Sequence, residues 1–176
     1  MKDEKNSKKG IADSDFLDFL VTTVIDITQK VAGMELVPSQ EIPHGTTLDI
    51  ASFSTRTNGD FRVSLAMSAH IDLLKEITRH MKGHTEVSMG DIEIYGGEYF
   101  NIIFGVFLSY VNNVLHTNTR FRVPLFSENL YPLRSLSDKR WYVRALSCPY
   151  GMMEVGLCKL SETEDCMEAQ SYKIKE

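Results

Sequence analysis

The residues between Tyr99 and Leu115 constrain the fold most, because apolar side chains cover most of the circumference of the helix that they would form. These are Tyr99, Phe100, Ile102, Ile103, Phe104, Val106, Phe107, Leu108, Val111, Val114 and Leu115. A helix that is apolar nearly all round is buried on most sides. We expect it to begin at Ser88, with Asp91 as its capping partner, and to run to about His116, roughly 40 Å.

One line along this predicted helix stays polar or small. Its members are Glu98, Asn101, Gly105, Ser109 and Asn112, at steps of three, four, four and three residues, which place them on one face. A solvated face is the simplest interpretation, but such a face usually carries Lys, Arg and Glu, which form helices well. Gly96 and Gly97 each cost about 1 kcal/mol relative to Ala inside a helix. The small residues therefore indicate close approach of another backbone, although the helix could also begin only at Gly97.

The remaining pattern predicts two further helices. Apolar residues recur at helical spacing from Phe16 to Val31, after Asp13 or Ser14 as a cap and before Gly33 as a stop. A second amphipathic helix is expected after Ser68 as its cap, ending at Gly83. Pro38 and Pro43 favour an extended connection after the first helix.

Alternation and turn residues predict the strands. We expect strands over 48–55 and 61–67 around the hairpin signal Asn58-Gly59, and then over 121–123, 141–148 and 152–160. The last two are joined by Cys148-Pro149-Tyr150-Gly151. Hairpin-linked strands with helices between them predict an α+β fold, in which an antiparallel sheet packs with a long central helix and two amphipathic helices.

Length and composition indicate one domain. Of 176 residues, 43 % are apolar, enough to bury a core in a domain over 14–160. We interpret 1–13 as a flexible tail and 161–176 as a polar C-terminal tail. A net charge of −5 disfavours a nucleic-acid partner, and no apolar run approaches the ~18 residues of a membrane helix. The charged N-terminus does not resemble a secretory signal, so a cytoplasmic protein is expected.

The usual metal and nucleophile signatures are missing from the sequence. Cys148, Cys158 and Cys166 form no Cys-x-x-Cys pair, so we expect neither a zinc site nor a disulfide framework. His80 and His84 have a spacing that suits a metal, but Gly83 lies between them and no third ligand follows. No nucleophile elbow or phosphate-binding loop occurs.

The polar line nevertheless has a recognisable form. Glu98-x-x-Asn101-x-x-x-Gly105 inside an apolar helix, followed by Arg122-Val123-Pro124, resembles the CheX/CheC family of chemotaxis phosphatases. The order of the helices and of the Asn58-Gly59 hairpin is also similar, over about residues 15–160. Family members often carry an acidic residue four positions before the Glu, where this chain has Ile94. The single Glu-x-x-Asn motif resembles the single-site, CheX-like branch, which implies a homodimer.

The resemblance implies a protein phosphatase, a hydrolase that acts on the aspartyl phosphate of a CheY-like response regulator in chemotaxis or two-component signalling. Glu98 and Asn101 would be the catalytic pair: an amide both donates and accepts hydrogen bonds and so can orient water, whereas the carboxylate would pair with the regulator's lysine. Gly105, Ser109 and Asn112 would bind the partner. Mg²⁺ is expected in the regulator, and this chain is expected to bind no cofactor.

Two other interpretations remain open at the level of sequence. The domain could be a non-catalytic binding module that docks a response regulator or a flagellar motor component. It could also be a dimeric structural protein in which the Glu98 face is buried between two copies.

Overall fold

The computed structural model describes residues 13–39, 49–83, 86–128, 133 and 141–160. Its helical elements are α1 (Asp13–Ala32), α2 (Ile71–Lys82), α3 (Met89–Asp91), the wide π-helical turn η1 (Ile92–Gly96) and α4 (Gly97–Leu115). Its strands are β1 (Val37–Ser39), β2 (Ile50–Asn58), β3 (Val63–His70), β4 (Arg120–Phe121), β5 (Leu125–Glu128), β6 (Trp141–Cys148) and β7 (Gly151–Lys159).

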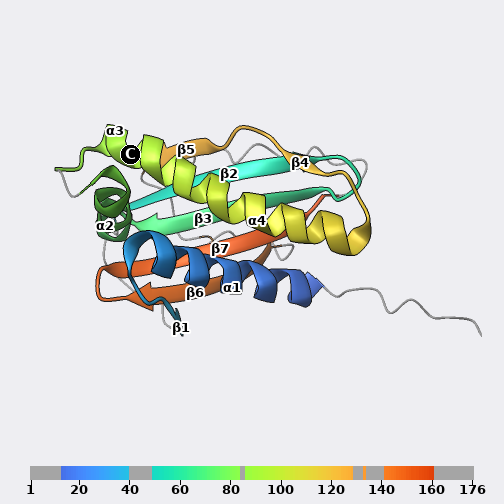
Figure 1. Cartoon of the computed structure of the whole chain (residues 1–176), viewed down its shortest axis with the longest axis horizontal. Coiled ribbons are helices and arrows are strands. Elements are labelled where there is room, and N and C mark those ends of the chain that lie inside the picture. Colours follow the sequence, from blue (N-terminus) through green and yellow to red (C-terminus); the bar gives the residue numbers. More distant parts are fainter. Residues whose placement is uncertain (1–12, 40–48, 84–85, 129–132, 134–140, 161–176) are drawn as a thin grey trace, which may run out of the picture.

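The strands form one antiparallel sheet. Their order is β1-β6-β7-β3-β2-β4, and β5 also pairs with β2. Helices α1 and α4 lie side by side across one face of the sheet, and α2 lies at one end (Figure 1). Strand β3 is central in the sheet and is buried from Val63 to Ala69. The predicted α+β fold, with its antiparallel sheet and long central helix, is confirmed.

The core lies between α4, α1 and the sheet. Phe100, Phe104 and Phe107 of α4 have no exposed surface. Phe100 contacts Phe53 of β2 with ring centroids 5.9 Å apart. Helices α1 and α4 are joined inside the core by a hydrogen bond between the hydroxyls of Thr28 and Tyr99. Burial raises the pKa of the Tyr99 phenol, so this hydroxyl stays protonated and available for that bond.

The long helix is confirmed, and it includes both glycines whose position the sequence left open. Helical structure continues from Met89 to Leu115, with Gly96 in the wide turn and Gly97 at the beginning of α4. Ser88 caps the first turn in a capping box with Asp91, as predicted. His116 ends the helix in the left-handed conformation, with φ 54°.

One predicted cap is wrong. Ser68 does not begin α2; it lies in β3, paired with Ser52 on one side and with Glu154 on the other. The helix begins at Ile71 after His70, which makes no side-chain cap. The predicted stop at Gly83 is correct, because this residue has φ 88° and closes the last turn. Pairing along the whole of β3 outcompetes the local capping tendency of a serine.

The strand predictions differ from the structure mainly at the ends. The strand over 141–148 is correct at both ends. The first hairpin is longer than predicted, since β2 extends to Asn58 and β3 to His70. The short strands β1 and β5 were not predicted as strands.

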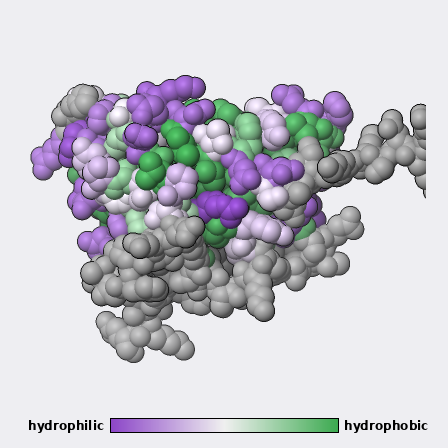
Figure 2. Space-filling view, turned by 90° about the horizontal axis from the view of Figure 1, so that it is seen from below, coloured by the Kyte–Doolittle hydropathy of each residue, from purple (hydrophilic) through white to green (hydrophobic). Residues whose placement is uncertain are grey.

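Figure 2 shows the side of the molecule that lies lowest in Figure 1. Hydrophilic and hydrophobic residues are mixed on its described part, and hydrophobic residues gather near the middle. Val37 of β1, at this edge of the sheet, is 46 % exposed. Among the helices that the structure describes, none is long and apolar enough to cross a bilayer.

Candidate functional site

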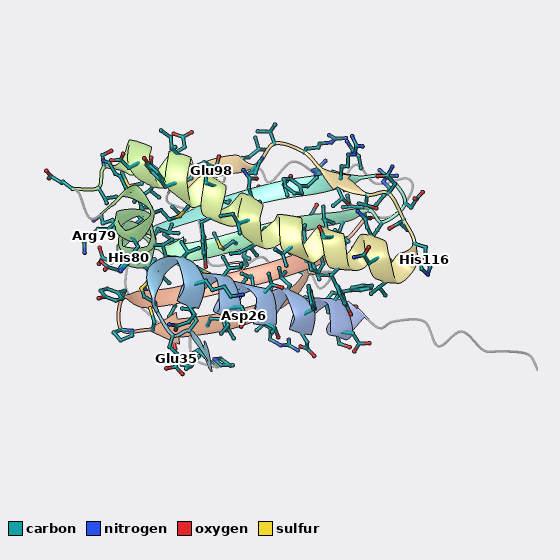
Figure 3. The ribbon with its side chains drawn as sticks, viewed as in Figure 1. Asp26, Glu35, Arg79, His80, Glu98 and His116 are labelled. Atoms are coloured by element: carbon teal, nitrogen blue, oxygen red, sulfur yellow. The ribbon has the colours of Figure 1, made fainter. Side chains whose placement is uncertain are left out.

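The candidate site is the outward face of α4. Glu98 is exposed near the beginning of this helix (Figure 3), and Asn101 lies one turn further, half-buried. Gly105 is half-buried and Ser109 is exposed. The helix therefore brings a carboxylate and an amide to one accessible face, as their spacing predicted. The catalytic role of the pair stays a prediction.

The amide of Asn101 has bonding capacity that the described chain does not use. Its Oδ1 atom is buried and has no hydrogen-bond partner. A buried polar atom without a partner is uncommon in folded proteins and calls for an explanation. Because this oxygen has almost no accessible surface, a water or an arriving partner would reach it only after the amide turns outward.

Packing among the described residues does not require glycine at position 105. A Cβ atom at this position would meet nothing within 4 Å. The hydroxyl of Ser109 donates to the carbonyl oxygen of Gly105 at 2.8 Å, a bond that any residue at position 105 could accept. Glycine in a helix interior costs about 1 kcal/mol relative to alanine. No contact among the described residues therefore requires glycine at position 105.

Asn112 is engaged inside the molecule. Its Nδ2 donates to the carbonyl of Thr119 at 2.9 Å, and its Oδ1 accepts from the Thr119 N–H at 2.8 Å and from the Thr117 hydroxyl at 2.9 Å. These bonds hold the turn after α4. Sequence spacing placed Asn112 in line with Glu98, but the turn accounts for this amide, and partner binding by Asn112 stays a prediction.

Apolar residues flank the polar line. Ile94, Ile102 and Val106 are 64 %, 39 % and 42 % exposed. The prediction that α4 is buried almost all round is wrong for Ile102 and Val106, which border Asn101 and Gly105 on the open side of the helix. Exposed apolar patches that are rimmed by polar residues often mark protein-docking surfaces. Sequence reasoning missed them because apolar residues at helical spacing usually face a core.

The turn before Glu98 is fixed from two directions. A Cβ on Gly96 would lie 2.7 Å from Cζ of Phe53, so only glycine fits against this ring. On the other side, Lys82 of α2 binds the Asp91 carboxylate at 2.9 Å. The backbone N–H of Ser88, then Lys82 and the Ser88 hydroxyl, lower the pKa of Asp91 to about 2. Wide helical turns recur at functional sites, and this one precedes Glu98 directly.

The described residues hold no group of three metal-ligating side chains. His80 contacts the backbone oxygen of Glu76 at 3.0 Å, and His84 lies outside the described residues. Cys148 is half-buried and has a free thiol, and Cys158 is buried. Cys166 also lies outside the described residues.

Comparison by sequence finds no match to a family model or to a curated protein. Comparison by structure does find matches. The chemotaxis protein CheX from Vibrio vulnificus superposes with a TM-score of 0.66 at 16 % identity, covering 85 % of this chain and 99 % of that one. A CheX from Desulfovibrio desulfuricans gives 0.64 at 14 % identity, covering 83 % and 99 %. A CheX from Borrelia burgdorferi, solved in a CheX–CheY–BeF3–Mg2+ complex, gives 0.63 at 14 % identity, covering 82 % and 97 %.

These structures match nearly the whole of their own length to this chain, at sequence identities that carry information about fold only. The chain therefore has the fold of the CheX-like and CheC-like chemotaxis proteins.

Proposed function

We propose that this chain acts in chemotaxis signalling in the cytoplasm, as a phosphatase of the aspartyl phosphate on a CheY-like response regulator. The observation that carries the proposal is the accessible pair Glu98 and Asn101 on one face of α4, with an unused amide oxygen and an open glycine beside it. Support also comes from the fold, which is shared with a CheX that was solved in complex with CheY.

In the proposed reaction, water is the acceptor of the phosphoryl group. Its oxygen forms a bond to phosphorus as the bond between phosphorus and the aspartyl oxygen breaks. The products are the free carboxylate, inorganic phosphate and the proton released from water. Asn101 is proposed to turn its amide oxygen outward on docking and to hold that water in line, because an amide can accept from the water and donate to a phosphoryl oxygen. The Mg²⁺ that neutralises the phosphoryl oxygens is proposed to belong to the regulator.

Glu98 is proposed to bind the regulator's lysine and so to align α4 with the phosphorylated site. It lies one turn before Asn101, so one docked orientation serves both side chains. Gly105 would allow the regulator's backbone to approach, and Ile102 and Val106 would supply apolar contacts at the edge. Ser109 is proposed to border this contact.

We also propose that the chain forms a homodimer. Val123, two residues before β5, and Leu125, the first residue of β5, are 84 % and 65 % exposed, and large apolar side chains exposed together often mark a protein interface. Light scattering would give a mass of twice 20.0 kDa for a dimer, whereas a mass of one chain at all concentrations would contradict this part of the proposal.

The test is the decay of phosphorylated regulator at a substoichiometric amount of this chain. Asn101→Ala is expected to slow the decay by about 100-fold, the usual order for loss of one transition-state hydrogen bond. Asn113→Ala is the matched control, because Asn113 is an exposed asparagine of the same helix. If the phosphorylated regulator decays equally fast with wild type and with Asn101→Ala, for every candidate regulator, the proposal is contradicted.

Stoichiometry separates catalysis from simple docking. An enzyme clears many equivalents of phosphorylated regulator, while a binding module retains one equivalent and leaves the decay of the excess unchanged. A structure of a stable dimer with Glu98 and Asn101 covered by the second copy would instead favour a structural role.

A further inference from the structure

Four arginines gather at the end of the sheet that carries the β2–β3 hairpin. Arg120 of β4 pairs with Asn58 of β2, and Arg122 donates from Nε to the Asn58 side chain at 3.1 Å. Arg56 lies two residues before Asn58, and its carbonyl accepts from the Arg122 N–H at 2.9 Å. Side chains that bear nitrogen project from this corner beside β4 (Figure 3).

The fourth arginine lies on the same side of the sheet. Phe61 contacts Phe16 of α1 and so faces the helices. Alternation along an extended chain then directs Arg62 to the opposite side. Ser64, two residues after Arg62, faces the same side as Arg62. Arg56 is the cross-strand partner of Ser64, so Arg56 and Arg62 both lie on the side away from the helices. We call Arg56, Arg62, Arg120 and Arg122 the arginine patch.

No acidic side chain neutralises the arginine patch within the described residues, where none of its members takes part in an ion pair. The nearest acid along the chain is Asp60 of the hairpin, whose Oδ2 accepts from the backbone of Asn118 at 3.3 Å. Arg62, Arg120 and Arg122 are exposed and Arg56 is half-buried. Two other described arginines have acidic partners: Arg79 binds Glu76, and Arg144 lies 3.8 Å from Asp18.

Acidic residues of the chain follow directly after a strand that ends beside the arginine patch. Strand β7 ends beside the patch, where the N–H of Leu160 donates to the carbonyl of Arg62 at 3.0 Å. The next residues include Glu162, Glu164, Asp165 and Glu168, with no basic residue among 161–168. Four arginines therefore stand at the point from which a segment with four carboxylates continues.

We propose that the acidic segment 162–168 of this chain docks on the arginine patch. Its reach is sufficient: eight residues beyond Leu160 span up to about 26 Å when extended, whereas the patch extends over three neighbouring strands, about 10 Å. Arginine binds carboxylates in a two-pronged geometry, and the short tether raises the effective concentration of the segment. The pairs are exposed, so the contact is sensitive to salt and an acidic competitor can displace it.

Cys166 provides the probe for the test. In full-length chain carrying Cys148→Ser and Cys158→Ala, a nitroxide label on Cys166 would broaden the NMR signals of nearby residues. At low ionic strength the amides of 56–62 and 120–122 are expected to lose most of their intensity, and those of 89–94 to keep it. At 1 M salt, where the Debye length is about 3 Å, the intensity is expected to return.

Two charge variants make the assignment specific. The variant Glu162→Gln, Glu164→Gln, Asp165→Asn and Glu168→Gln is expected to abolish the broadening at low salt. Arg120→Gln with Arg122→Gln should do the same, while Arg79→Gln with Arg144→Gln, the matched control, should leave it intact. If the cysteine variants fail to fold, the chemical shifts of the arginine Nε–H groups are compared between the wild type and the acid-to-amide variant. Docking requires these shifts to differ at low salt and to agree at 1 M salt.

Three results would overturn the proposal. One is an absence of broadening over 56–62 and 120–122 at low salt. If the chain also binds phosphatidylserine vesicles under these conditions, the patch recognises a membrane surface rather than the acidic segment. Another is broadening that persists in the arginine variant. The third is broadening that arises only between a labelled and an unlabelled copy, which would make a second chain the occupant.

Discussion

Gly96 lies against the ring of Phe53 so closely that a Cβ atom would come within 2.7 Å of Cζ and 3.0 Å of Cε2. The contact joins the wide turn before α4 to the middle of strand β2, and the same ring packs on Phe100 and on Phe126. The contact between Gly96 and Phe53 therefore fixes how the beginning of α4, which carries Glu98 and Asn101, packs on the sheet. Neither Gly96 nor Phe53 has a chemical role in the proposed site.

Gly96→Ala is expected to destabilise the fold, because the added methyl must displace a buried ring. Overpacking of this kind costs about 1–3 kcal/mol, which exceeds the gain in helix propensity. The matched control is Gly97→Ala, where the nearest atom lies 3.8 Å away and the propensity gain of up to about 1 kcal/mol remains. Urea unfolding of both variants checks this, and equal free energies of unfolding would contradict it.

Gly105→Ala is expected to separate stability from function. A Cβ at 105 meets nothing among the described residues, so the substitution should raise the free energy of unfolding by about 0.5–1 kcal/mol. Under the proposed function it should also slow dephosphorylation of the regulator, because the methyl stands where the partner approaches. Unfolding and turnover are measured on the same sample. A stabilised variant with unchanged turnover would show that the partner does not approach at position 105.

Much of the fold follows from local signals in the sequence. The α1 and α4 helices arise from apolar residues at a spacing of three and four, and the β2–β3 hairpin from Asn58-Gly59, where Gly59 has φ 113°. Ser68 shows where local reasoning fails. A serine before an apolar helical pattern favours a cap, but Ser68 is paired with Ser52 and Glu154, and such long-range pairing leaves no local signal.

The candidate site was also predictable only where local spacing determines it. Spacing alone places Glu98 and Asn101 on one face of a helix. The exposure of Ile102 and Val106 depends on which side of α4 the sheet covers, and the close fit of Gly96 depends on Phe53, a residue of a strand much earlier in the chain. The internal role of Asn112 depends on the turn at 117–119. None of these relationships has a sequence pattern of its own.

Asn112→Ala is expected to weaken the turn after α4. It removes three hydrogen bonds and leaves the N–H of Thr119, a residue only 3 % exposed, without its acceptor. An unsatisfied buried donor costs about 1–3 kcal/mol. Thermal unfolding measures the loss, and Asn113→Ala on the exposed side is the control. If Asn112→Ala unfolds like wild type and only regulator binding changes, partner contact rather than the turn explains this residue.

Asp91 should make the beginning of the long helix sensitive to acid. The Ser88 N–H, then Lys82 and the Ser88 hydroxyl, hold the pKa of Asp91 at about 2, below its ordinary value of 3.8. A carboxyl whose pKa is lower in the folded state contributes stability above its unfolded pKa and loses it as the pH falls through the folded value. Asp91→Asn is therefore expected to lower the urea midpoint at pH 7, and this difference from wild type should shrink as the pH falls below 4 and vanish only below pH 2. Glu93→Gln, an exposed acid two residues on, is the control and should leave the midpoint close to wild type. A difference for Asp91→Asn that stays constant from pH 7 to pH 2 would mean that the charge of this carboxylate does not hold the helix in place.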